Sequence, residues 1–320
     1  MLESNDFTVI MDWQGIIKEF IFYAESQNLS KNTIKVRKSL IKRFSSYCKA
    51  NDCNDPLNVT RKLIRSFMRY ERQTGMSASY VNQMLITVRA FYRFLIDEEY
   101  LDEDSNPTDK VKFMKKTRKV TETFSDEEMI QIINAASNHK NKFMSSRNKL
   151  IVMMMADSGL RVNELVNLSV DDVSPDRILV RHGKGDRQRV VYVTNILARE
   201  VLKYQRLKKS YFKERSMLNP EFFFVGFKGE RLRNDGIQKM LRRIEPQIKL
   251  RESIRFSPHT FRHYFASSQL RNGADILTVS RMLGHADLNT TQIYLSSIVN
   301  EELLESAKAT SPLANLNKQK

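Results

Sequence analysis

The stretch from Ser257 to Tyr294 constrains this chain most, because it places chemically active side chains at helical spacing between helix-stop signals. His259 and Arg262 are three residues apart, so on a helix they project from one face about one turn from each other. The apolar positions of that helix would turn inward; they are Phe261, Tyr264, Phe265 and Leu270. The pattern therefore predicts a helix that holds a polar pair over a cleft.

Two further helical segments follow within the same stretch. A second apolar-periodic run begins after Asn272 and Gly273 and ends at Gly284, where left-handed backbone is favoured. His285 follows directly. Tyr294 lies in the first turns of a third predicted helix, whose candidate N-caps are Asn289, Thr290 and Thr291.

Two segments upstream carry further basic side chains at turns. Residues 157–165 read DSGLRVNEL and follow an apolar run that predicts a buried helix, so Arg161 would emerge at the edge of a cleft. Lys184 lies in a Gly-Lys-Gly sequence between two β-rich runs, which predicts a hairpin with this lysine near its tip. The sequence does not match a nucleotide-binding phosphate loop, and no helix follows it, so we expect no ATP site.

These boxes resemble the signature of the tyrosine recombinases, the phage-integrase family. The six catalytic positions of that family fall here on Arg161, Lys184, His259, Arg262, His285 and Tyr294. The resemblance implies a mainly α fold with a small β-hairpin or sheet, in which an N-terminal helical, SAM-like core-binding bundle precedes a catalytic domain. It also implies a site-specific recombinase or integrase, of the kind carried by phages and mobile elements, that cleaves and rejoins duplex DNA.

The resemblance implies a chemical role for each side chain. Arg161 and Arg262 would hold the non-bridging oxygens of the scissile phosphate and stabilise the charge of the transition state. Tyr294 would attack the phosphorus and form a 3′-phosphotyrosine, with His259 as general base or orienting group.

The two remaining positions would complete the reaction. Lys184 would protonate the departing 5′ oxygen, and His285 would donate a hydrogen bond to the phosphate. Because the covalent intermediate conserves the bond energy for rejoining, the reaction requires no nucleotide, and we expect neither a metal nor a cofactor.

The excess of basic residues indicates a polyanionic partner. The 320-residue chain has 53 Lys and Arg against 37 Asp and Glu, a formal net charge of +16. Basic side chains that neutralise phosphates release counterions, so double-stranded DNA is the expected partner.

No basic amphipathic helix, lipidation motif or long apolar run points to a membrane. Cys48 and Cys53 fit neither a zinc site nor a disulfide framework, and the acidic N-terminus fits no signal peptide, so we expect a cytoplasmic location.

Residues 1–105 predict a bundle of four helices that forms the DNA-binding, core-binding domain. Apolar residues recur there at helical spacing, and Ser30, Thr60 and Ser77 are candidate helix starts. Basic side chains lie on the predicted exposed faces; the candidate DNA contacts are Lys35, Lys38, Lys42, Arg43, Arg89 and Arg93. For any one of them, a merely solvated face is the alternative.

Residues 106–122 predict a basic interdomain linker, because Pro107 ends the bundle and the segment that follows has no apolar period. Its candidate phosphate contacts are Lys115, Lys116 and Arg118, and a flexible hinge without DNA contact is the alternative. A capping box that begins at Ser125 opens the catalytic domain, residues 123–320.

The segment after Tyr294 offers one apolar helix face and then a polar tail. It suggests docking on a neighbouring protomer, and thus a dimer or tetramer on DNA, with packing on its own domain as the alternative. Two other functions stay open: a recombinase-fold DNA-binding regulator, such as a phage repressor, that does not use catalysis, and a topoisomerase that relaxes DNA without exchanging strands.

Overall fold

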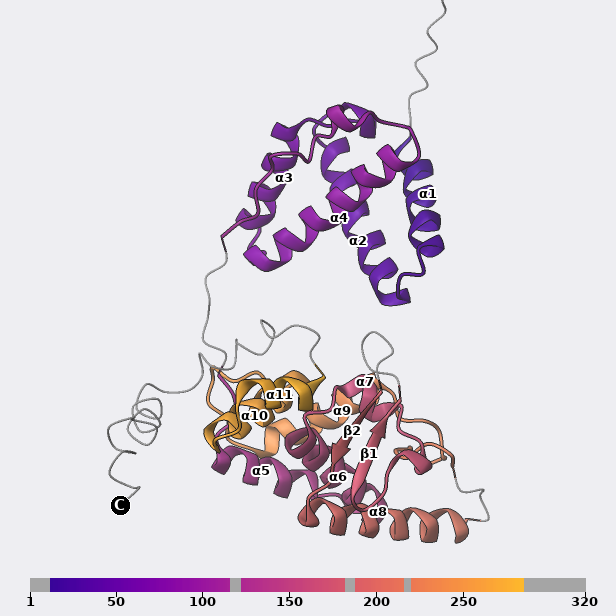
Figure 1. The fold of residues 1–320 in the computed structure, drawn as a ribbon, viewed down its shortest axis with the longest axis vertical. Helices are drawn as coiled ribbons and strands as arrows, with labels where there is room; N and C mark the ends of the chain where they lie inside the picture. The colour runs from indigo at the N-terminus through magenta and orange to yellow at the C-terminus, as the bar shows by residue number, and fades with distance from the viewer. Residues whose placement is uncertain (1–11, 116–121, 182–187, 216–219, 285–320) are drawn as a thin grey trace, which may run out of the picture. The chain divides into compact units, whose positions relative to one another are not determined.

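The chain divides into two compact units, Met1–Arg118 and Lys119–Lys320. A computed structural model describes residues 12–115, 122–181, 188–215 and 220–284 (Figure 1). Both described parts are mainly helical, and the C-terminal unit contains a two-stranded sheet, which confirms the fold class expected from the sequence. Within the described ranges, no helix has the length and apolar character that a membrane crossing requires.

The N-terminal unit is built from four helices, each of which begins at a side-chain cap. They are α1 (Trp13–Ser26), α2 (Lys31–Lys49), α3 (Arg61–Gln73) and α4 (Ala78–Asp97), with short 3₁₀ turns at Pro56–Asn58 and Glu103–Ser105. Ser30, Thr60 and Ser77 each accept a hydrogen bond from a backbone N–H of the helix that they start, as the sequence predicts. Helix α4 contacts the other three helices, and its Phe91 stacks on Trp13 in the core.

The segment that follows α4 packs back onto the same unit. Val111 is buried in the core, and the side-chain amide of Asn82 on α4 pairs with the backbone N–H and carbonyl of Met114. Arg89 donates to the carbonyl of Val111. Residues 106–114, which the sequence assigns to a linker, therefore carry contacts that tie them to the helical bundle.

The C-terminal unit is organised around one buried helix. Its helices are α5 (Asp126–Ala136), α6 (Lys142–Ser158), α7 (Val162–Val166), α8 (Asn195–Lys213), α9 (Asn234–Ile244), α10 (Pro258–Arg271) and α11 (Ile276–Leu283). Helix α6 packs against α5, α8 and α10, and its residues 150–155 are almost all buried, as the unbroken apolar run predicts. The capping box at the start of α5 is also present, between Ser125 and Glu128.

The sheet of this unit is a hairpin of two antiparallel strands. Strand β1 (Arg177–Val180) pairs with β2 (Arg189–Tyr192) in a register that sets Arg177 opposite Tyr192 and Val180 opposite Arg189. Lys184 lies in the chain between the strands, at 182–187, outside the described residues. Arg189 begins β2 and is separated only by Gln188 from the segment that carries the predicted general acid.

The C-terminal end of α6 meets α10 and α11 at a glycine. Gly159 caps α6 in the left-handed conformation, with φ of 59°. A Cβ at this position would lie 2.5 Å from the ring of Phe265 and 2.9 Å from the side chain of Leu283. Only a residue without a side chain lets α10 and α11 approach this turn, and the approach positions the arginines described next.

Candidate active site

Arg262 is held in the interior by two backbone carbonyls from different segments. It lies on α10 and is 6% exposed. Its Nη1 donates to the carbonyl of Gly159 at 2.5 Å, and its Nη2 donates to the carbonyl of Leu283 at 2.7 Å. Each carbonyl belongs to a helix end that has no further intrahelical donor, so the guanidinium joins the ends of α6 and α11.

Arg161 also reaches the end of α11. It is the residue before α7, placed there by the left-handed turn at Gly159. Its Nη2 donates to the carbonyl of Gly284 at 3.3 Å, and its Nη1 donates to Glu164 at 2.9 Å. The two predicted arginines thus bind the carbonyls of consecutive residues, Leu283 and Gly284, directly before His285 in the chain.

Glu164 is a buried carboxylate shared by two guanidiniums. It accepts hydrogen bonds from the backbone N–H and Nη1 of Arg161, and Arg189 binds it end-on, from Nη1 to Oε1 and from Nη2 to Oε2, each at 2.8 Å. Burial would raise the pKa of Glu164, but the hydrogen bonds and charge of Arg189, and then those of Arg161, outweigh burial and hold the pKa below its usual value. The carboxylate is therefore ionised at neutral pH.

The cluster carries more positive than negative charge. Within the described residues, the guanidiniums of Arg161 and Arg189 share the carboxylate of Glu164. Burial of such an excess is costly unless an anion joins the cluster. The arrangement suits a phosphate, whose oxygens accept from guanidinium donors in a fixed geometry.

His259 lies one turn before Arg262, at the start of α10, and differs from it in exposure. It is exposed and lines an open groove together with Val162 of α7 and His263. Burial, and then the charges of His259 and Arg262, lower the pKa of His263, so this neighbour is neutral at pH 7 and adds no charge beside His259. Of the expected pair, the arginine is interior and the histidine is accessible to a ligand in the groove.

The other predicted site residues lie outside the described ranges. They are Lys184, His285 and Tyr294 of the catalytic set, and Lys116 and Arg118 of the basic linker. The structure thus brings Arg161 and Arg262 together and places His259 at the adjoining groove.

Sequence reasoning missed the part played by Arg189. In the sequence, Glu164 belongs to the DSGLRVNEL segment and Arg189 follows the segment of Lys184, and neither position indicates a contact. Their spacing in the sequence does not indicate this contact, because the two residues are 25 positions apart and meet only in the folded chain. A buried acid three residues after Arg161 is the only local signal, since such an acid needs a cationic partner.

The basic residues of the N-terminal unit fall into two groups. Arg43 pairs with the buried Glu71 at 2.7 Å, and Arg93 pairs with Asp97 at 2.9 Å. Arg89 donates to a backbone carbonyl and stacks 4.5 Å over the ring of Phe113. These three candidate DNA contacts already have partners within the protein.

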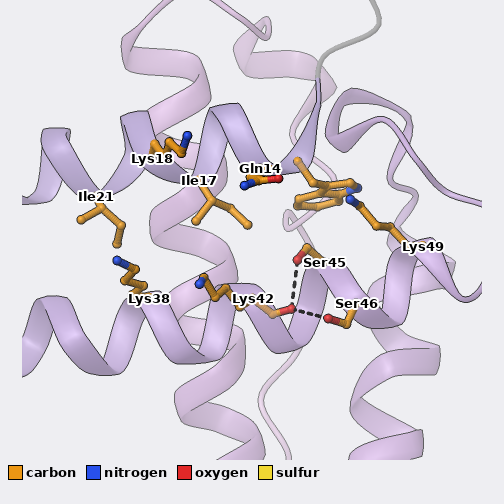
Figure 2. A pocket seen from close by; sticks show the side chains of 10 residues that line it. Gln14, Ile17, Lys18, Ile21, Lys38, Lys42, Ser45, Ser46 and Lys49 are labelled. Carbon is orange, nitrogen blue, oxygen red and sulfur yellow. Dashed lines mark hydrogen bonds between the residues drawn. The ribbon is translucent and has the colours of Figure 1, made fainter.

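Lys35, Lys38 and Lys42 are exposed and make no ion pair within the described part of the chain. Figure 2 shows Lys38 and Lys42 rising from α2 into a groove beside α1, where Lys18 and Lys49 also lie. Trp13, Ile17 and Ile21 supply the apolar lining of this groove. Lys115 is likewise exposed. These four lysines are the candidate DNA contacts of the described N-terminal unit that stay accessible.

Comparison with known protein families finds matches to both units. Residues 122–301 match the phage integrase family, and residues 17–99 match the phage integrase N-terminal SAM-like domain. The chain is 30% identical over 281 residues to a tyrosine recombinase XerD of Halalkalibacterium halodurans, which covers 87% of this chain and 91% of the relative. It is 31% identical over 278 residues to a XerD of Oceanobacillus iheyensis, which covers 86% of this chain and 91% of the relative.

Solved structures share the fold. The integrase of the transposon Tn1549, in complex with transposon right end DNA, superposes with a TM-score of 0.72 at 14% identity, over 94% of this chain and 100% of that chain. The XerH site-specific recombinase, bound to a palindromic difH substrate after cleavage, superposes with a TM-score of 0.70 at 21% identity, over 93% of this chain and 84% of that chain.

Proposed function

The chain belongs to the phage integrase family of tyrosine recombinases, and from this premise we propose that it is a site-specific recombinase that cleaves and rejoins duplex DNA. The observation that carries the proposal is the meeting of Arg161 and Arg262 at the carboxyl end of α11. Beside them, the guanidiniums of Arg161 and Arg189 share the carboxylate of Glu164, and the carbonyls that Arg161 and Arg262 bind belong to the two residues before His285 in the chain. It is a phosphate-binding arrangement at the position where the signature tyrosine segment begins.

The proposed first step is attack by the phenol oxygen of Tyr294 on the scissile phosphorus. A phenol with a pKa of about 10 is protonated at neutral pH, so its proton must pass to a base, for which the exposed His259 is our candidate. The bond from phosphorus to the 5′ oxygen breaks as the bond to Tyr294 forms, and Lys184 supplies a proton to the leaving oxygen.

Arg161 and Arg262 stabilise the negative charge that the phosphate oxygens gain in the transition state, and His285 adds a hydrogen bond. The 5′ hydroxyl of a partner strand then attacks the 3′-phosphotyrosine and releases Tyr294. Each step exchanges one phosphoester for another, so rejoining consumes no external energy. The proposed reaction uses side chains of this chain alone, without a cofactor or metal.

We propose that the N-terminal bundle and the catalytic unit both bind the duplex. The accessible lysines Lys35, Lys38, Lys42 and Lys115 support this, because they have no acidic partner within the described residues.

Strand exchange needs two duplexes and four active sites. The proposed active form is therefore a dimer on each site that pairs into a tetramer, with the C-terminal tail as the candidate link. A lambda integrase dimer on its core site shows a similar fold. Since the proposed substrate is cellular or mobile-element DNA, we place the protein in the cytoplasm.

A suicide-substrate experiment tests the proposal. A binding site is first selected from a randomised duplex pool, and the protein is then incubated with that duplex carrying a nick beside each candidate cleavage position. We expect a covalent protein–DNA adduct, absent from Tyr294→Phe, and strand exchange with an unnicked duplex. An adduct with relaxation of supercoiled plasmid but no exchange would instead indicate a topoisomerase. Specific binding without any adduct would indicate a DNA-binding regulator and would overturn the proposal.

A further inference from the structure

We propose that Arg189 is a positioning residue for DNA cleavage, which fixes Arg161 through Glu164. The inference rests on the proposed function, since it concerns the same phosphate-binding cluster. Arg189 is 13% exposed at its side chain, although it begins a strand that is otherwise partly open to solvent. An arginine side chain with so little exposure requires a partner, and the partner is Glu164.

The contact between Arg189 and Glu164 has the geometry that fixes both groups. Two parallel hydrogen bonds of 2.8 Å join the two Nη atoms to the two carboxylate oxygens, which prevents the carboxylate from rotating. The same oxygens receive the backbone N–H and Nη1 of Arg161. The plane of the carboxylate, set by Arg189, therefore sets where the guanidinium of Arg161 points.

Arg189 also touches the end of α11. A Cβ on Gly284 would lie 3.1 Å from Cδ of Arg189 and 3.3 Å from its Nε, and Gly284 has a left-handed φ of 64°. The carbonyl of this glycine accepts from Arg161. One arginine thus links three parts of the site: the hairpin that carries Lys184, the acid that holds Arg161, and the turn that leads to His285.

The charge balance supports a functional rather than a purely structural contact. Arg161 and Glu164 alone would form a neutral pair, and the pair would weaken the attraction of Arg161 for phosphate. With Arg189 present, the carboxylate is shared, and the cluster keeps a net positive charge for an anion. The buried Nε of Arg189 has no hydrogen-bond partner among the described residues, so Glu164 does not satisfy this guanidinium completely.

The test compares Arg189→Gln and Arg189→Lys with a matched control, Arg177→Gln. Arg177 begins the other strand of the same hairpin, is exposed and makes no ion pair within the described chain. Single-turnover cleavage of the suicide duplex, the Kd for that duplex and the Tm are measured for each variant. For Arg189→Gln we expect cleavage to slow about 100-fold, with a Kd within about threefold of wild type. Arg189→Lys keeps the charge but loses the second hydrogen bond, so we expect an intermediate loss. The control cleaves at the wild-type rate.

A double-mutant cycle separates positioning from structural damage. If Arg189 acts through Arg161, the variant Arg161→Ala with Arg189→Gln cleaves no more slowly than Arg161→Ala alone. Additive losses in the double variant would overturn the inference. So would a slowing of Arg189→Gln that is fully explained by a lower Tm and a weaker Kd, or cleavage by Arg189→Gln at the wild-type rate. These results all require a wild-type adduct. Absence of that adduct defeats the proposed function, and the inference falls with it.

Discussion

Arg161 and Arg262 serve one phosphate in the proposed reaction, but their surroundings differ, and this difference is testable. Arg262 is buried and satisfies the carbonyls of Gly159 and Leu283, whereas Arg161 is about a quarter exposed at its side chain. Either change to alanine should slow cleavage at least about 100-fold, equivalent to roughly 3 kcal/mol. Only Arg262→Ala leaves two buried carbonyls without their donor, so it should also reduce the free energy of unfolding by about 2 kcal/mol or more.

Urea denaturation and single-turnover cleavage, measured on both variants, check this prediction. Arg161→Ala serves as the control for stability, because the loss of a partly exposed guanidinium costs less than the loss of a buried one. Equal stability of the two variants would contradict the structural role assigned to Arg262.

The ion pair of Glu128 and Arg251 predicts a pH dependence of stability. The hydrogen bond from Arg251 lowers the pKa of Glu128 from 4.5 to about 2. Because the folded pKa lies below the unfolded value, the stabilisation is complete above pH 4.5 and is lost as the pH falls from there toward 2. Arg251 is half exposed, so solvent screening reduces the contribution to about 1–2 kcal/mol. The free energy of unfolding of Glu128→Gln should therefore fall less steeply than that of wild type between pH 5 and pH 3; parallel curves would refute the assignment.

The junction of α6, α10 and α11 depends on the absence of a side chain at Gly159. Alanine there would be strained by the positive φ of 59° and would collide with Phe265 and Leu283. We expect Gly159→Ala to lower the free energy of unfolding by about 2–4 kcal/mol. Gly15, in α1, has ordinary backbone and nothing within 4 Å of an added Cβ, so Gly15→Ala should stabilise the protein slightly. Thermal unfolding of both variants decides the matter, and similar Tm values would show that the junction tolerates a side chain.

Helix starts could be predicted from the sequence because their signals are local. Ser30, Thr60 and Ser77 cap helices in the structure, and the box from Ser125 to Glu128 closes as expected, since each interaction spans three residues. The packing of residues 106–114 could not be predicted, because it depends on a hydrogen-bond pair between Asn82 and Met114, 32 residues apart. The meeting of Arg161 with Arg262 followed only from family resemblance, and the contact of Arg189 with Glu164 followed from neither pattern nor resemblance.

The charge of the whole molecule predicts a steep salt dependence of DNA binding. Each phosphate contact contributes about 0.9 to the slope of log K against log salt concentration. Replacing Lys35, Lys38 and Lys42 together by alanine should reduce that slope by about 2–3, because these side chains are exposed and unpaired within the described residues. Arg93→Ala is the control, since Arg93 already pairs with Asp97 and Glu103. The salt-dependence slope of this variant should differ from that of wild type by less than 1. An unchanged slope in the triple variant would place the DNA on another face of the bundle.

A tyrosine recombinase must form one covalent bond between its tyrosine and DNA, and this bond is the central requirement of the whole chain. After reaction with the suicide duplex, nuclease and trypsin digestion followed by mass spectrometry identifies the residue that carries DNA. We predict a nucleotide joined through its 3′ phosphate to Tyr294, within the peptide that follows Arg281. A nucleotide on another side chain, or no nucleotide on any peptide from protein that binds the duplex tightly, would contradict the account.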